Sequence, residues 1–410
     1  MKVNEVDRIL SDTAYVRVSG TPDEVRCAEY LHDICAQMGL DAKIEKFSLT
    51  MFNEDKAELF ADGKRINCKS YFGCGCGTVK AELYYLVDDE PYSLEKCKNK
   101  IVLSEMPVNS KLYEKLVDNG AVGFITYNGD VEIPDKDIIR KELRFHIEAD
   151  KKIPGVNIHA KDAVALVKSR SKSIEMTVEQ TCYEGSSQNI VLDLLGDTDE
   201  TVTITAHYDS TSLSLGAYDN MSGSIALLYL AEYFAKKHHR RGLRLMWCGS
   251  EERGLIGSLE YCKSHKAELE NCILNINLDM LGTVMGKFVS ICTADEKMVD
   301  YVKAFLSDKR ISSTVNHAIR SSDSNSFALY GVPSVSFVRY APGSIAKIHT
   351  RYDTSDVLDP QRIIDDADVV AKFTEIALNA SDFPTEKGIS DKIKEDVDTY
   401  FSNFSRILNR

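Results

Sequence analysis

The stretch TVTITAHYDS, residues 201–210, decides the fold class of this chain. Residues 201–207 read as an apolar strand, and His207 and Asp209 stand at its end. The same pattern predicts strands at 189–195, 242–248, 272–279, 287–292 and 333–339, and helices at 222–238, 257–269, 295–306 and 361–378. Apolar strands that alternate with helices predict a three-layer α/β/α fold with a mostly parallel central sheet.

The chain ahead of this region falls into two parts. A helix is predicted over 23–38 and a strand over 42–49, so residues 1–50 form an N-terminal helical part of the main domain. Residues 51–185 carry short elements of their own. The order KIVL, a helix, GAVGFITYN, and IPGVNI before a second helix resembles the protease-associated domain. This resemblance implies a smaller α/β domain inserted into the main one.

The main domain is predicted to span 186–385, and residues 386–410 a C-terminal helix. Phe401, Phe404 and Ile407 lie on one face of that helix, which favours docking on a core.

Charge and composition exclude several classes of function. The 410 residues include 63 acidic and 50 basic ones, for a net charge of -13. A negative surface repels phosphate backbones and anionic membranes, so neither nucleic acid nor a membrane is an expected partner. No apolar run is long enough to span a bilayer, and the first 20 residues do not resemble a secretion signal. The sequence predicts a soluble, cytoplasmic protein, and it leaves open whether the protein forms a homo-oligomer.

The cysteines favour reduced thiols over a disulfide framework. There are 11, an odd number, and most stand alone in the sequence. Cys74 and Cys76 form a close pair, but they lack the second pair that a four-ligand structural zinc site needs. We therefore interpret this pair as a glycine-rich lead into a strand.

His207 and Asp209 are the first candidates for a metal site. In an extended chain they project to the same side, so the Asp209 carboxylate can hold the His207 ring. A metal-bound imidazole usually donates its other N–H to such a carboxylate. A hydrogen-bonded surface pair would explain the same two residues.

Four further segments place polar residues after predicted strands or before helices. Asp219 precedes a helix and could be a helix cap, Asp279 could begin a turn, and His349 could be structural. Glu251 and Glu252 follow a strand, where they could instead stabilise the first turn of a helix. Because consecutive residues point apart in extended chain, one glutamate could bind a metal while the other deprotonates water.

Taken together, these residues suit a pair of metal ions. The candidate ligands offer only nitrogen and oxygen atoms, and they are His207, Asp219, Glu252, Asp279 and His349. Such a set matches two divalent ions about 3.5 to 4 Å apart that are bridged by one carboxylate. Three carboxylates leave excess positive charge on two ions, which favours a bridging hydroxide at neutral pH.

The ordered motifs TAHYDS, GAYDNMSG, GSEERG, NLDM and IHTRYDT resemble the co-catalytic di-zinc exopeptidase family. That family includes bacterial leucyl aminopeptidases, glutamate carboxypeptidase II and, with one zinc, glutaminyl cyclase. The resemblance covers roughly residues 188–380 and implies a metallo-aminopeptidase that uses two divalent ions, most naturally zinc, to hydrolyse peptides.

The resemblance also implies a role for each candidate. His207, Asp219 and Asp279 would bind one zinc, and Asp219, Glu252 and His349 the other. Glu251 would be the general acid and base acting with the bridging hydroxide, and Asp209 would orient His207. A tyrosine hydroxyl often assists the developing oxyanion in this family, and Tyr340 is the candidate here.

Two alternatives remain open. The scaffold also supports a carboxypeptidase or dipeptidase, in which Arg320 or Arg339 would bind the substrate carboxylate. The second alternative is a non-catalytic binding homologue, although a suitable residue stands at every ligand position. The chain departs from many relatives at residue 324, where a serine replaces the histidine of an S-D-H motif. The resemblance therefore does not determine the shape of the pocket.

Overall fold

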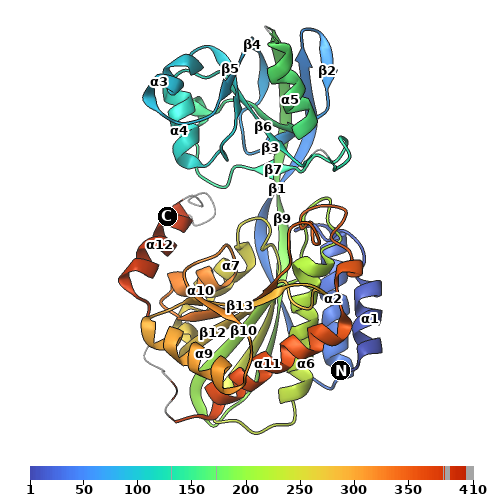
Figure 1. Cartoon of the computed structure of the whole chain (residues 1–410), viewed down its shortest axis with the longest axis vertical. Coiled ribbons are helices and arrows are strands. Elements are labelled where there is room, and N and C mark those ends of the chain that lie inside the picture. The colour runs from blue at the N-terminus through green and yellow to red at the C-terminus, as the bar shows by residue number, and fades with distance from the viewer. Residues whose placement is uncertain (131, 172, 382, 384–387, 403–410) are drawn as a thin grey trace. The chain divides into compact units, whose positions relative to one another are not determined.

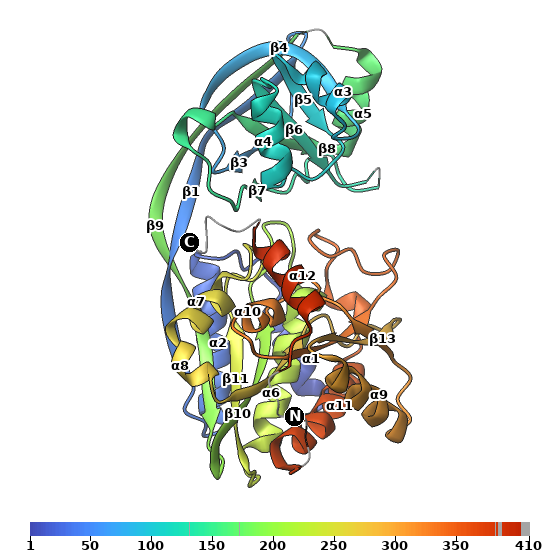
Figure 2. The ribbon, with the colours of Figure 1, turned by 90° about the vertical axis from the view of Figure 1, so that its left-hand side faces the viewer.

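The computed structural model describes residues 1–130, 132–171, 173–381, 383 and 388–402 (Figure 1). The chain divides into two compact units. The first comprises Met1–Leu49 and Ser186–Tyr400, and the second is built on Thr50–Gly185. Two long paired strands, β1 (Lys43–Ala61) and β9 (Ile174–Leu194), carry the chain out of the first unit and back into it (Figures 1 and 2).

The first unit is built on a sheet with the strand order β14-β13-β15-β12-β10-β11-β9. Its further strands are β10 (Thr198–His207), β11 (Arg241–Cys248), β12 (Cys272–Leu278), β13 (Lys287–Thr293), β14 (Thr314–His317) and β15 (Ser334–Tyr340). β10 is parallel to both β11 and β12, β12 is parallel to β15, and β13 is parallel to β14. Only the pairs β9–β11 and β13–β15 are antiparallel among the described strands of this order. The predicted mostly parallel sheet is confirmed.

Helices cover both faces of this sheet. They are α1 (Val3–Asp12), α2 (Pro22–Gln37), α6 (Ser222–Phe234), α7 (Ile256–Ser264), α8 (Lys266–Leu269), α9 (Glu296–Asp308), α10 (Ser324–Leu329), α11 (Pro360–Asn379) and α12 (Asp391–Ser402). Two short helical turns, η3 (Ala217–Met221) and η4 (Ser355–Val357), lie in the loops.

Alternate strand residues enter two different hydrophobic cores. On β11, Leu245 and Trp247 pack in the core that contains α1, α2, α6 and α11, whereas Met246 and Cys248 pack in a smaller core with residues of α7 and α10. Because side chains along a strand alternate between the two faces of a sheet, both faces are buried. This is the predicted three-layer α/β/α arrangement.

The second unit has its own strands and its own core. Its sheet continues from β9 in the order β4-β5-β6-β8-β3-β7. Its elements are β2 (Lys64–Ile66), β3 (Cys68–Phe72), β4 (Gly77–Leu86), α3 (Pro91–Leu94), η1 (Glu95–Cys97), β5 (Lys100–Ser104), α4 (Ser110–Asp118), β6 (Gly123–Asn128), β7 (Lys141–Glu142), η2 (Ala149–Lys151), β8 (Gly155–His159) and α5 (Ala160–Ser169). Gly155 is required where it stands, because a Cβ atom there would lie 2.0 Å from the Phe124 ring in this core.

The C-terminal part of the prediction is covered only in part. Helix α12 ends at Ser402, and Phe404 and Ile407 lie outside the described residues. Within the described part of the chain, no helix is both long and apolar enough to span a membrane.

Candidate metal centre

The predicted ligands stand at the carboxyl ends of neighbouring strands. His207 is the last residue of β10, and Asp279 follows β12 directly. Glu252 lies in the turn after β11, and His349 in the loop after β15. Because β11, β10, β12 and β15 are adjacent and parallel, these ends share one edge of the sheet. Asp219 reaches the same edge from turn η3, ahead of α6.

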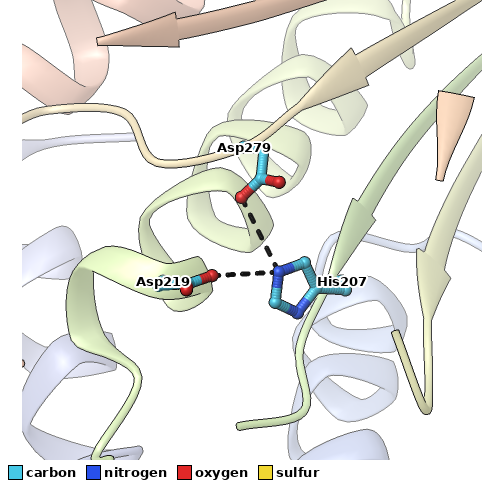
Figure 3. A group of neighbouring side chains, drawn as sticks. All are labelled: His207, Asp219 and Asp279. Atoms are coloured by element: carbon cyan, nitrogen blue, oxygen red, sulfur yellow. Dashed lines mark ion pairs between the residues drawn. The ribbon is translucent and has the colours of Figure 1, made fainter. Parts of the chain in front are cut away.

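The structure gathers these five side chains into two groups of three that share Asp219. In the first group, Nε2 of His207 lies 3.2 Å from Oδ1 of Asp219 and 3.6 Å from Oδ1 of Asp279 (Figure 3). In the second group, Nε2 of His349 lies 3.1 Å from Oδ2 of Asp219 and 3.1 Å from Oε2 of Glu252. Asp219 thus turns one carboxylate oxygen toward each group.

This spacing fits two metal ions. Around a tetrahedral zinc ion with bonds of about 2.0 to 2.2 Å, neighbouring ligand atoms lie about 3.3 to 3.6 Å apart. The contacts within the two groups range from 3.1 to 3.6 Å. Oδ1 of Asp279 is also buried without a hydrogen-bond partner among the described residues, so it is available as a ligand atom.

The electrostatics of the site also favour cations. Burial lowers the pKa of His207, but the charge of Glu251 and the nearby aspartates outweigh burial and raise that pKa well above its ordinary value. For His349, Glu252 and Asp219 likewise outweigh burial and raise the pKa to about 11. The carboxylates clustered around the two imidazoles would thus stabilise a bound metal ion.

Solvent reaches the two groups unequally. The side chain of His207 is 2% exposed, whereas that of His349 is 42% exposed. The second group therefore marks the open side of the site, from which a substrate could approach.

Glu251 lies beside the two groups and belongs to neither. Its side chain is buried, and burial is the main cause that raises its pKa well above the ordinary value, with the charges of Glu252 and Asp279 adding to the rise. Its charge acts strongly on His207, whereas Glu252 contacts His349. The two consecutive glutamates therefore serve different sides of the site, as a ligand and a separate base would require.

Asp209 connects two of the ligand-bearing segments. Its Oδ1 lies 3.4 Å from Nδ1 of His207. The same carboxylate accepts hydrogen bonds from the backbone N–H groups of Glu251 at 3.0 Å and Glu252 at 3.2 Å, and from the hydroxyl of Ser19 at 2.8 Å. Asp209 thus also fixes the turn that carries the glutamates.

Tyr340 lies at the end of β15, near the first group. Burial raises the pKa of its phenol, and the charge of Asp279 adds to the rise. The positive charge of Arg320 acts in the opposite direction and lowers this pKa. The structure therefore brings Tyr340 and Arg320 together on the Asp279 side of the centre.

Arg339 is held elsewhere, which corrects its assignment to a substrate carboxylate. Its Nη2 lies 2.5 Å from Oδ1 of Asp366 and its Nε 2.8 Å from Oδ2, while Nη1 donates to the Gly286 carbonyl at 3.1 Å. A bidentate ion pair of this kind occupies one edge of the guanidinium. Sequence alone could not separate Arg320 from Arg339, because the partner of Arg339 lies on α11.

Arg17 is a buried residue near the site that sequence reasoning did not single out. Its guanidinium donates to the carbonyls of Tyr208 at 2.7 Å, Leu215 at 2.6 Å and Gly216 at 3.0 Å, on both sides of the loop between His207 and Asp219. All three acceptors are backbone oxygens, so no residue pattern could have revealed them.

Glu24 and Asp323 are buried carboxylates that were also missed. Glu24 accepts a hydrogen bond from the Ser187 hydroxyl at 2.7 Å. Burial raises the pKa of Glu24 to about 8 and that of Asp323 to about 6. In the sequence, Glu24 can be interpreted only as part of a helix start. In the structure, its second oxygen accepts a hydrogen bond from the backbone N–H of Gly20.

The ligand-bearing turns adopt strained backbone. Ser250, Met280 and His349 have φ angles of 57°, 56° and 60°, in the left-handed region that residues other than glycine seldom occupy. Such residues cost about 1–3 kcal/mol each and cluster at functional sites, where surrounding contacts hold them.

Comparison with known proteins agrees with this geometry. Residues 189–374 match the model of peptidase family M28. The chain is 27% identical over 293 residues to aminopeptidase YwaD of Bacillus subtilis, an alignment that covers 68% of this chain and 61% of that protein. It is 26% identical over 390 residues to human carboxypeptidase Q, covering 87% of this chain and 80% of that protein.

Solved structures show the same fold. A zinc aminopeptidase from Bacillus subtilis superposes with a TM-score of 0.77 at 22% identity, over 96% of this chain and 99% of that one. An aminopeptidase from an Aneurinibacillus strain gives a TM-score of 0.75 at 22% identity, over 94% of this chain and 96% of that one. The segment that matches peptidase family M28 contains all five predicted ligands and Glu251.

Proposed function

We propose that this chain is a di-zinc metallo-aminopeptidase that removes N-terminal residues from peptides. The observation that carries the proposal is the shared carboxylate of Asp219, which turns one oxygen to His207 and the other to His349. Relatives named as aminopeptidases support the reaction type. The pair of ions, their identity as zinc, and the N-terminal specificity are the parts that need testing.

The residues would divide the work as follows. His207, Asp219 and Asp279 would hold one ion, and Asp219, Glu252 and His349 the other. When bound, such ions polarise a carbonyl and make water a stronger nucleophile. Glu251 would take a proton from the attacking water and pass it to the leaving amine, for which a raised pKa is an advantage.

Tyr340 would assist the reaction from the end of β15. Its phenol lies where the charges of Asp279 and Arg320 both act on it. A hydroxyl at this position could donate a hydrogen bond to the oxygen that gains charge during the reaction.

Metal content and activity should be measured together, before and after chelation. We expect two zinc ions per chain and hydrolysis of aminoacyl anilides and free peptides. Dialysis against a chelator should remove the zinc and abolish the activity. Zinc should restore activity, because chelation removes the ions and leaves the ligand residues chemically unchanged. Full activity without metal would contradict the proposal. A loaded protein that hydrolyses neither free nor blocked substrates would instead indicate a binding homologue.

A carboxypeptidase or dipeptidase is the second candidate, and Arg320 favours it. Among the described residues this guanidinium forms no ion pair with a carboxylate, although it lies beside Tyr340. A substrate carboxylate one residue beyond the scissile bond could pair with it. Human carboxypeptidase Q is among the relatives.

Replacing Arg320 with alanine distinguishes the two candidates. If Arg320 binds a substrate carboxylate, we expect KM for unblocked dipeptides to rise about 10- to 100-fold, the cost of losing a charged hydrogen bond, while aminoacyl anilides are unaffected. Arg320→Lys should recover part of the loss because it keeps the charge. An equal effect on both substrates, or none, would leave the aminopeptidase proposal and remove the dipeptidase one. Hydrolysis of N-blocked dipeptides would identify a carboxypeptidase.

We further propose that the unit built on Thr50–Gly185 is a protease-associated domain. Its own core and its alternation of short strands and helices support this assignment. We also propose a cytoplasmic location, on the ground that an odd set of mostly isolated cysteines suits a reducing compartment.

A further inference from the structure

Asp353 is a buried carboxylate close to the metal centre that belongs to neither ligand group. It is 1% exposed and follows His349 by four residues, in the loop before η4. Its carboxylate contacts the backbone of Asp219, and Asp219 and His349 contact each other in the second group.

Both oxygens of Asp353 are engaged by the segment that leads into Asp219. Oδ1 accepts from the backbone N–H of Tyr218 at 2.8 Å. Oδ2 accepts from the backbone N–H of Asp219 at 3.2 Å and from the hydroxyl of Ser214 at 3.1 Å. The carboxylate therefore grips two successive peptide groups, the second of which belongs to the shared ligand itself.

The segment held by Asp353 needs hydrogen-bond acceptors from outside for its backbone N–H groups. Within η3, Asp219 has φ and ψ of -113° and 88°, and Asn220 of -142° and 42°, so neither is helical. Backbone N–H groups outside a regular helix need other acceptors when they are buried, and residues 217–221 are all buried. Asp353 supplies the acceptors for two of them.

Asp209 makes the same set of contacts on the other side of the centre. Its Oδ1 accepts from the N–H of Glu251, and its Oδ2 accepts from the N–H of the ligand Glu252 and from a serine hydroxyl, that of Ser19. Each aspartate thus follows a histidine ligand and holds the peptide group of a carboxylate ligand from another segment. The repeat of one donor pattern at two places indicates a common purpose.

We propose that Asp353 is a positioning residue that fixes the shared carboxylate of Asp219 relative to His349. A bridging carboxylate must present both oxygens at once, so a small rotation of its backbone would misplace it for both ions. Asp353 prevents that rotation by tying the Asp219 backbone to the loop that carries His349. The inference rests on the proposed metal site and adds to it a residue outside the ligand set.

The test is the substitution Asp353→Asn, with metal affinity as the main readout. An amide offers only one acceptor oxygen, and its NH2 group would face a backbone or hydroxyl donor, so the two-sided grip is lost while size is kept. We expect zinc affinity, measured by competition with a chromogenic chelator, to fall about 10- to 100-fold, as for other partners of metal ligands. Activity at limiting zinc should fall with it and recover in part at excess zinc.

Asp356→Asn is the matched control, because Asp356 is an exposed aspartate three residues further along the chain, in η4, and its Oδ2 accepts a hydrogen bond from the Thr354 hydroxyl at 3.0 Å. It should bind zinc like the wild type. If Asp353→Asn does not fold, Asp353→Glu keeps the charge but moves the carboxylate by one methylene, and should shift the visible spectrum of the cobalt-loaded protein.

The outcomes separate the two proposals. Wild-type zinc affinity in folded Asp353→Asn, or a loss no larger than in Asp356→Asn, would overturn the positioning role. A lower melting temperature with unchanged affinity would assign Asp353 to stability alone and would also overturn it. Failure of the wild-type protein to bind metal would instead contradict the proposed function.

Discussion

Replacing Glu251 with glutamine is expected to lower kcat by about 10²- to 10⁴-fold, the usual contribution of a general acid or base, while both metal ions stay bound. Glutamine keeps the size of the side chain but cannot accept and return a proton. Metal should be retained because Glu251 belongs to neither group of ligand atoms. The measurements are steady-state kinetics on an aminoacyl anilide and elemental analysis of the same sample.

Glu252→Gln is the natural control for this result, since it makes the same chemical change at the next residue. Oε2 of Glu252 lies 3.1 Å from Nε2 of His349, so this variant should lose metal from the second group as well as activity. The contrast between the two variants tests whether Glu251 is the base and Glu252 a metal ligand. Wild-type turnover by Glu251→Gln would remove this residue as the base, and metal loss would make it a ligand.

Replacing Asp219 with alanine is expected to abolish activity and to empty both groups. This one side chain provides an oxygen at 3.2 Å from Nε2 of His207 and another at 3.1 Å from Nε2 of His349. Without it each group keeps only two protein ligands, fewer than the three that catalytic zinc sites normally use. Elemental analysis after dialysis should find well under one ion per chain.

Asp279→Ala serves as the control for the shared role. Asp279 contacts only the first group, so this variant should keep an ion in the second group while losing the first. A variant of Asp219 that retains one tightly bound ion would show that the carboxylate does not bridge. Circular dichroism of both variants would establish that the fold is intact.

The parts of the fold that could be predicted are those with a strong local signal. The strands ending in His207, Cys248 and Leu278 were predicted to within a few residues, because buried parallel strands are apolar throughout. Helix α1 was not predicted, since only Val6, Ile9 and Leu10 of its ten residues are buried and its pattern is short. The full length of β1, which runs to Ala61, was also missed, because only part of it is buried.

The candidate ligands were predictable for a related reason. Each polar side chain follows an apolar strand or precedes a helix, and the carboxyl ends of parallel strands collect at one edge. Arg339 was misassigned because its partner, Asp366, lies on another element. Asp353 stood within a quoted motif, but no role could be given to it, since its donors are backbone groups of residues 218 and 219.

The sequence by itself predicted the layer architecture and pointed to the candidate ligands, because these depend on residue type and spacing along the chain. The tertiary structure alone decided that Arg339 pairs with Asp366 and which buried aspartates hold the ligand-bearing turns. The physical reason is that hydrogen bonds to backbone groups and contacts between distant segments depend on where the chain folds back, and any residue can supply a peptide N–H.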